Sequence, residues 1–257
     1  MHLAEAMRDD PLTPEEAEFA FDVLKAKPQV GRRVLRATAL QNEAACLRLP
    51  IAWKGRVEAG VVAWYRGLGF AAVHGENGPW RQIAGLLCWD IFNGGQHVGF
   101  HHALQRHAPE SFDAGLYSAH QESVDACLAV LNIPAKALRQ IRDVAAEKGG
   151  VSGTWVRWNA GRQRAAEALV ERVPAHALRA VLIHMLRHPG AHGRGFPDLL
   201  VWRGEEVRLI EVKGPGDQLR PGQVQWLLRL REAGLKADVL RVEWRDKASE
   251  DATAPSS

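Results

Sequence analysis

The sequence predicts an α/β fold: a small mixed sheet built from both ends of the chain, flanked by helices and interrupted by a large helical insertion. Short apolar runs typical of strands occur at 70–74, 199–202 and 207–212. Between the first two, from about 100 to 190, apolar residues recur with helical spacing. The strand–helix–strand pattern over 207–244 is long enough for a right-handed parallel crossover.

The composition is that of an ordinary globular protein with a core of its own. The 257 residues are 46% hydrophobic and 25% charged, and Lys and Arg outnumber Asp and Glu by 33 to 30. This mildly basic balance permits a nucleic-acid partner without requiring one. No apolar run reaches the roughly 18 residues of a membrane span, and the first residues lack an apolar signal core. We therefore expect a cytoplasmic protein with no membrane contact.

The three cysteines are scattered, and they predict neither a disulfide framework nor a CxxC zinc site. Positive charge gathers in residues 151–197, which contain seven arginines and two glutamates. This segment either contacts phosphates or forms a solvated helical face. Trp155 and Trp158 either stack on bases or pack on the inserted helices. No zinc site is expected at a group of four histidines that lacks a completing acid or cysteine: His97, His101, His102 and His107.

Residues 1–55 are expected to form an N-terminal helical segment. Thr13 is a helix cap three residues before Glu16, and Pro28 stops that helix. The following stretch is ambiguous, with helical periodicity around Leu40 to Leu49.

Residues 56–245 are predicted to form the main domain, and 246–257 a flexible tail. A helix from about Gly55 to Tyr65 leads to the first strand, and a second helix ends near Phe92. The insertion, about 97–190, is expected to contain helices over 101–107, 120–132, 134–147, 159–171 and 174–187. Beyond it we expect strands over 199–202, 207–212 and 236–244, and a helix over 221–233.

The most informative feature is a predicted hairpin whose turn is Gly204-Glu205. A two-residue turn at this point places Asp198 directly opposite Glu211, with their β-carbons about 5 Å apart. Two carboxylates in this position repel each other unless they share a proton or hold a cation. Lys213 follows Glu211 by two residues and so lies on the same face of the strand.

Two carboxylates and a lysine suit a hard cation, Mg²⁺ or Mn²⁺, and the hydrolysis of phosphodiesters. The lysine would position the attacking water or stabilise charge. A surface hairpin with a salt bridge is the alternative interpretation. Gln223 lies in the next helix, where it either faces the site and binds water or phosphate or is simply exposed.

Three sequence blocks resemble the VRR-NUC branch of the PD-(D/E)xK nucleases, and more narrowly the catalytic C-terminal region of the Fanconi-anaemia-associated nuclease family. The first block is Gly69–Glu76, continuing through Gly85–Phe92. The second is Gly195–Trp202, and the third is Leu209–Pro215. The resemblance covers about residues 60–244 and implies a restriction-endonuclease-like core.

The resemblance also implies roles for individual residues. Glu76 would be a third carboxylate on the metal, the backbone carbonyl of Val212 a further ligand, and Lys213 the catalytic lysine. A carboxylate at position 76 is physically reasonable because a helix begins just after it. The phosphate-binding arginines of the family do not map clearly. Candidates for DNA contact are Arg194, which adjoins the Asp198 loop, and then Arg187 and Arg164, with a salt bridge as the alternative for each.

The resemblance implies a structure-specific DNA nuclease of the 5′-flap endonuclease and 5′-to-3′ exonuclease type, acting in interstrand-crosslink repair. Its partner would be branched DNA with a 5′ phosphate, and the helical insertion would hinder four-way junctions. Such a protein would work at the bacterial nucleoid, or in the nucleus of a eukaryote. Two alternatives remain: a non-catalytic module that binds branched DNA, and a Holliday-junction or restriction-type nuclease.

Overall fold

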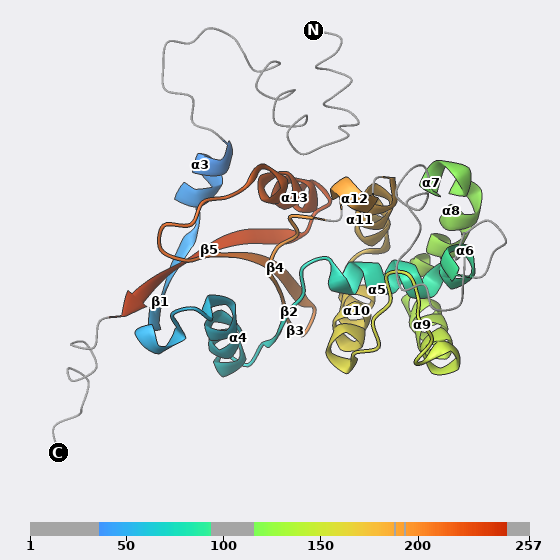
Figure 1. The fold of residues 1–257 in the computed structure, drawn as a ribbon, viewed down its shortest axis with the longest axis horizontal. Coiled ribbons are helices and arrows are strands. Elements are labelled where there is room, and N and C mark those ends of the chain that lie inside the picture. The colour runs from blue at the N-terminus through green and yellow to red at the C-terminus, as the bar shows by residue number, and fades with distance from the viewer. Residues whose placement is uncertain (1–35, 94–115, 188, 193, 246–257) are drawn as a thin grey trace, which may run out of the picture.

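The computed structural model describes residues 36–93, 116–187, 189–192 and 194–245. The expected N-terminal helix, the helix at 101–107, the four histidines and the C-terminal tail lie outside these ranges. The remaining chain forms a five-stranded sheet with a helical block beside it (Figure 1). This arrangement confirms the predicted α/β class.

The sheet has the strand order β1-β5-β4-β3-β2 and is mixed. β1 and β5 are parallel, as are β5 and β4, whereas β3 is antiparallel to both of its neighbours, β4 and β2. The strands are β1 (Ala45–Pro50), β2 (Ala71–His74), β3 (Leu199–Arg203), β4 (Glu206–Lys213) and β5 (Lys236–Arg245). The predicted parallel crossover from β4 to β5 is confirmed, with α13 (Pro221–Glu232) as its helix.

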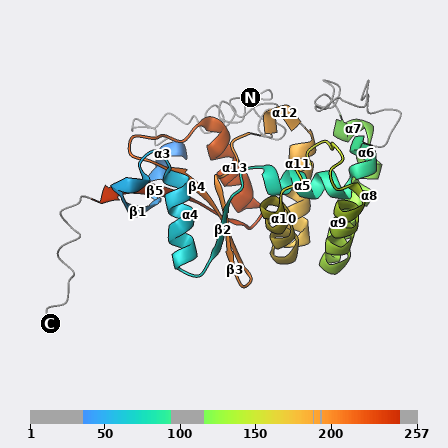
Figure 2. The same ribbon diagram turned by 60° about the horizontal axis from the view of Figure 1, so that its bottom comes forward.

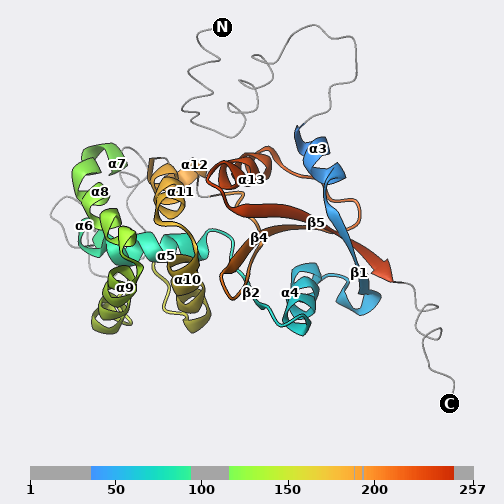
Figure 3. The same ribbon diagram turned by 180° about the vertical axis from the view of Figure 1, so that it is seen from behind.

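Helices cover both faces of the sheet. α4 (Val57–Gly67) lies on one face, while α13 and the short α3 (Arg36–Asn42) lie on the other (Figure 3). Alternate residues of the strands face the two sides because side chains alternate along a strand. Leu199 and Ile210 therefore pack in the cluster beneath α4, whereas Leu200 and Leu209 join the larger cluster of α13 and the helical block.

The helical block connects β2 to β3, and its elements in chain order are α5 (Gly78–Leu87), α6 (Trp89–Asn93), α7 (Leu116–Ala119), α8 (Gln121–Ala129), η3 (Val130–Asn132), α9 (Pro134–Lys148), α10 (Ala160–Arg172), α11 (Ala175–Arg187) and α12 (Pro189–His192). α5 passes through the middle of the block and is buried on nearly every side. Figure 2 shows β2 and β3 between α4 and α10. The block is thus joined to the sheet at the ends of the strands that carry the predicted site.

Two local expectations are wrong. The helical periodicity of Leu40 to Leu49 holds only to Asn42, because residues 45–50 form β1. This strand lies within the segment expected to be helical, and it pairs with β5 along its whole length. A run of six residues is too short for its periodicity to decide between helix and strand, and the free edge of β5 decides it. The helix expected to reach Phe92 is also interrupted, at Cys88.

Candidate active site

The hairpin register agrees with the prediction. Arg203 pairs with Glu206 around the turn, and the ladder ends with Leu199 opposite Ile210. Asp198 lies one residue beyond this last pair, and its Oδ2 accepts a hydrogen bond from the backbone N–H of Val212, 2.8 Å away. The Asp198 side chain is therefore held against β4 next to Glu211.

Backbone hydrogen bonds between the end of β2 and the start of β3 place the upstream Glu76 next to Asp198. His74 pairs with Leu199 at the end of β2. Beyond that pair, the carbonyl of Asp198 accepts hydrogen bonds from the N–H groups of Gly75 (2.9 Å) and Glu76 (3.4 Å). Glu76 has a φ of 44°, a left-handed conformation that costs free energy in a residue with a side chain and is commonest at functional sites. The strained turn sends the chain into α5 and leaves the Glu76 carboxylate beside Asp198.

The side chains of His74, Glu76 and Asp198 form a cluster. Each offers one ligand atom, and these atoms all lie within 4.8 Å of one another. His74 was part of a motif quoted from the sequence, but no metal-binding role was assigned to it. Its place next to Asp198 follows from the pairing of His74 with Leu199, which joins segments far apart in the chain and is evident only in the structure.

Glu211 and Lys213 form a buried pair at the end of β4. The Lys213 Nζ lies 2.9 Å from the Glu211 Oε1, with the two side chains 9% and 1% exposed. Gln223, on the first turn of α13, contacts both: its Oε1 accepts from Lys213 at 2.9 Å, and its Nε2 donates to Glu211 Oε1. Gln223 thus faces the site, and it binds the acid–lysine pair itself.

The orientation of Gln223 follows from how α13 begins. Its Oε1 also accepts the backbone N–H of Arg220, which caps the helix. The loop before Asp198 packs tightly on this turn: Gly195 has a φ of 83°, and a Cβ there would lie 2.7 Å from the backbone carbon of Gly222. Only glycine permits this close approach. The loop that carries Asp198 and the helix that carries Gln223 are therefore held in one arrangement.

Burial and neighbouring negative charges raise the pKa values of both Glu211 and Asp198. The pKa of Glu211 is raised to about 7, first by burial and then by the charge of Asp198, with Glu76 adding to it and Lys213 opposing it. Burial also raises the pKa of Asp198, against the hydrogen bond from Val212. Glu58 on α4 contributes to this shift, and sequence reasoning missed it as a neighbour of the site.

The donor atoms fit a divalent cation. Among the described residues, the Oε2 atom of Glu211 is buried and has no hydrogen-bond partner. An unpaired carboxylate oxygen in such surroundings is costly unless a cation or a proton satisfies it. Carboxylate oxygens with one imidazole suit Mg²⁺, Mn²⁺ and similar ions. The acids that gather here are thus able to hold a metal, with Val212 between Glu211 and Lys213 on the same strand.

The arginines proposed for DNA contact lie at different distances from this centre. Arg194 is exposed, directly before Gly195 in the Asp198 loop, and Arg164 is exposed on α10. Arg187 is exposed at the end of α11, with its guanidinium 5.9 Å from the centre of the Tyr117 ring. The structure places another arginine, Arg162, against Gly78 beside the cluster. Nothing in the arginine-rich stretch distinguished Arg162 beforehand.

Within the part of the chain that is described, no helix has both the length and the apolar character needed to cross a membrane.

Known proteins resemble this chain in sequence and in fold. The VRR-NUC domain model matches residues 129–244. A Fanconi-associated nuclease 1 from Danio rerio is 32% identical over 187 residues, 69% of this chain and 19% of the relative. The Fanconi-associated nuclease 1 homolog of Pseudomonas aeruginosa is 29% identical over 178 residues, 68% of this chain and 32% of the relative.

A solved structure of paFAN1 bound to a 5′-flap DNA with a two-nucleotide flap and a gap has the same fold. The TM-score is 0.75 at 24% sequence identity, and the match covers 95% of this chain and 45% of that one. The chain therefore spans between a fifth and a third of the length of these relatives and about half of that structure. The matches confirm the predicted resemblance: this chain contains a VRR-NUC domain match and is homologous to the Fanconi-associated nucleases.

Proposed function

We propose that this chain is a metal-dependent, structure-specific DNA nuclease that uses Mg²⁺ or Mn²⁺. One observation carries the proposal: Glu76, from far upstream, lies beside Asp198, and Asp198 is held next to Glu211 and its buried partner Lys213. A salt-bridged surface hairpin would leave its acids in water and would not gather a third carboxylate. The names of the homologues, which are nucleases, support the same conclusion.

The metal, when bound, lowers the pKa of water and offsets the negative charge that develops on the phosphate. Glu76, Asp198 and Glu211 would hold it, with His74 and the carbonyl of Val212 as further donors. Glu211 is deprotonated at the pH where it binds a cation, since its raised pKa of about 7 falls when positive charge arrives.

Lys213 would act on the reacting groups rather than on the metal. Its ammonium projects from β4 beside Glu211, where it orients the attacking water and stabilises the charged phosphate. Gln223 positions Lys213, because its Oε1 accepts one of the three ammonium protons while Glu211 holds a second, which leaves the third available. Hydrolysis would leave a 5′ phosphate and a 3′ hydroxyl.

The preferred substrate would be branched DNA with a 5′ flap, cut endonucleolytically and then from the 5′ phosphate. The support is that paFAN1 was solved with flapped DNA and shares the fold. Interstrand-crosslink repair would be the process, at the nucleoid or in the nucleus. Arg194 lies near enough to the Asp198 loop to meet the DNA, whereas Arg164 and Arg187 would act only on more distant phosphates.

The test compares labelled 5′-flap, four-way-junction and duplex DNA with Mn²⁺, with Mg²⁺ and with EDTA. We expect incision of the flap that requires a metal, and none by Asp198→Ala, which should still bind DNA by fluorescence anisotropy. Cutting by Asp198→Ala at the wild-type rate would refute the proposed site. Binding of branched DNA without cutting would indicate the non-catalytic module, and preferred cutting of the four-way junction would indicate a resolvase.

A further inference from the structure

A groove with a volume of about 560 Å³ adjoins the acidic cluster. Its walls come from the end of β2, the start of α5 and the segment that leads into α10. The residues that matter for its chemistry are His74, Arg157, Trp158 and Arg162. His74 belongs both to the cluster and to the groove. Whatever occupies the groove therefore lies directly beside the proposed metal.

Two arginines of the groove have no acidic partner. Among the described residues, neither Arg157 nor Arg162 forms an ion pair. The Arg162 guanidinium lies against Gly78, where a Cβ would be 2.9 Å from its Nε. Burial and then the charge of Arg157 lower the pKa of Arg162, with Glu76 opposing them. Two guanidinium groups held close together without an acid favour an anionic ligand.

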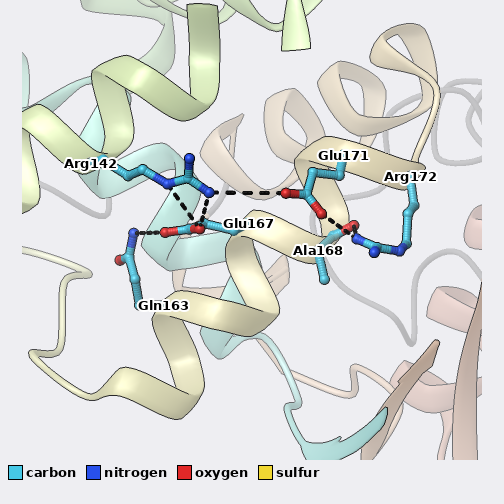
Figure 4. A network of polar contacts seen from close by, with 6 residues as sticks. All are labelled: Arg142, Gln163, Glu167, Ala168, Glu171 and Arg172. Atoms are coloured by element: carbon cyan, nitrogen blue, oxygen red, sulfur yellow. Dashed lines mark hydrogen bonds and ion pairs between the residues drawn. The ribbon is translucent and has the colours of Figure 1, made fainter. Parts of the chain in front are cut away.

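Two other arginines, Arg142 on α9 and Arg172 on α10, are paired with acids. Figure 4 shows these two arginines with the α10 acids Glu167 and Glu171. Arg142 lies 2.6 Å from Glu167, and Arg172 lies 2.5 Å from Glu171. Glu167 and Glu171 thus neutralise these two arginines. Neither glutamate forms an ion pair with the groove arginines.

The groove is held in shape by buried polar groups. The side chain of Gln82, 1% exposed on α5, accepts the backbone N–H of Arg157 at 3.0 Å. The same side chain donates to Gln163 on α10. Asn159 caps α10 by accepting the N–H of Arg162 at 3.0 Å. Both arginines therefore project from backbone that is fixed before any ligand arrives.

An aromatic side chain completes the groove. Trp158 is 38% exposed, yet its Nε1 donates to the carbonyl of Val151 at 2.7 Å, and its ring lies 6.0 Å from that of Trp89. Trp155, in contrast, is half-buried and packs edge-on against Phe92. The two interpretations of this pair of tryptophans thus apply to different residues: Trp155 packs inside, and Trp158 is available.

We propose that this groove holds one unpaired nucleotide of the DNA next to the scissile phosphate, with Arg157 and Arg162 on its phosphate and its base against Trp158. The inference rests on the proposed nuclease function and names a subsite for it. A cationic groove with an aromatic ring is the pattern of single-strand binding, because a base is free to stack on protein only outside a duplex. A groove of several hundred Å³ is of the size that takes a nucleotide-sized ligand.

The experiment measures cleavage of a flap and binding of the same flap in EDTA. Arg157→Gln and Arg162→Gln should each raise KM about 10-fold while changing kcat by less than about 3-fold, and each should lower the slope of log Kd against log salt by about one. Arg162→Lys should recover part of the loss, because it keeps the charge. Arg142→Gln, which removes an arginine that is paired with an acid, is the control and should behave as wild type.

Stacking of the base on Trp158 is measured from the fluorescence of 2-aminopurine placed at the first unpaired position of the flap DNA. Its fluorescence should be quenched by wild type and by Trp158→Phe, and not by Trp158→Ala, with circular dichroism confirming that both variants fold. Arginine variants indistinguishable from Arg142→Gln, or quenching that survives Trp158→Ala, would overturn the inference. A wild-type chain that binds flaps with these signatures but never cuts them would instead refute the nuclease assignment alone.

Discussion

A glutamate near each end of β4 is paired with a lysine, but the surroundings of the two pairs differ: Lys236 comes from the neighbouring β5, and Lys213 from β4 itself. At one end the Lys236 Nζ lies 3.0 Å from Glu206, with side chains 62% and 27% exposed. At the other end Lys213 lies 2.9 Å from Glu211, with side chains 9% and 1% exposed. The distances are nearly equal, so any difference in behaviour comes from the environment of the pair.

The pKa values of the two glutamates shift in opposite directions. Hydrogen bonds from Lys236 and Arg208 lower the pKa of Glu206. The pKa of Glu211 rises to about 7, because burial and the nearby Asp198 outweigh its lysine. In the exposed pair, the lysine and the glutamate neutralise each other. In the buried pair, Asp198 adds a second negative charge that the single ammonium of Lys213 does not cancel. The end of β4 near α13 thus has an excess of negative charge, which a bound cation would offset.

The largest effect should come from removing the buried lysine. Lys213→Ala should lower kcat by on the order of 10²–10³-fold, because a charge-stabilising group in a water-poor site is lost. DNA affinity should change little. Single-turnover cleavage of a flap at saturating Mn²⁺ measures the loss, with Lys236→Ala as the matched control at the exposed end. Equal rates for the two variants would show that the burial of the pair has no catalytic consequence.

The second prediction concerns stability and pH in metal-free buffer. A raised pKa in the folded state means that ionising Glu211 opposes folding: the penalty is absent below the ordinary pKa of Glu, grows as pH rises through about 7, and is then complete. Glu211→Gln should therefore stabilise the protein at pH 8 by up to about 3 kcal/mol, and by much less at pH 5. Urea unfolding in EDTA at both pH values measures the difference.

Glu206→Gln provides the control with the opposite sign. Its lowered pKa stabilises the fold above the ordinary pKa of Glu, and this contribution is lost as pH falls. The variant should therefore gain no stability at pH 8. A gain by Glu206→Gln, or a loss by Glu211→Gln that is equal at pH 5 and pH 8, would contradict the contrast between the two ends.

A smaller effect is expected from His74, the imidazole member of the cluster. His74→Ala should raise the Mn²⁺ concentration for half-maximal cleavage by about 10-fold, since the carboxylates still hold the ion. Calorimetric titration with Mn²⁺ alone should show the same weakening. His176→Ala, an exposed histidine on α11, should leave both values unchanged. Unaltered Mn²⁺ affinity in His74→Ala would remove this residue from the proposed site.

The smallest effect is expected from a substitution in the exposed Glu206–Lys236 pair. Lys236→Gln should shift Tm by less than about 2 °C and leave flap cleavage unaffected, because exposed ion pairs contribute little to stability. Differential scanning fluorimetry at low and at high salt is sufficient. A larger shift would mean that the Glu206 end is more than a solvated pair and would weaken the comparison.

Much of the hairpin was predictable because its determinants are local. The Gly204 turn sets the register, and the alternation of side chains then puts Glu211 and Lys213 on one face. The helices of the insertion were predictable from their periodicity and their prolines. β1 was not, because six residues are too few to show a strand pattern, and they become a strand only where β5 offers an edge.

The site as a whole was not predictable from local pattern. Glu76 entered only through the family resemblance, and His74 and Arg162 were missed. Each reaches the site through contacts between segments far apart in the chain, such as the hydrogen bonds of Gly75 and Glu76 to the carbonyl of Asp198. No spacing in the sequence records such a contact.

The sequence by itself thus determined the α/β class, the hairpin register and the acid–lysine motif, because turns and side-chain alternation act over a few residues. Only the tertiary structure decided which distant residues complete the centre and how deeply each is buried. The physical reason is that burial and electrostatic repulsion depend on what surrounds a side chain in space. The two glutamates at the ends of β4 therefore behave differently although each has a lysine partner about 3 Å away.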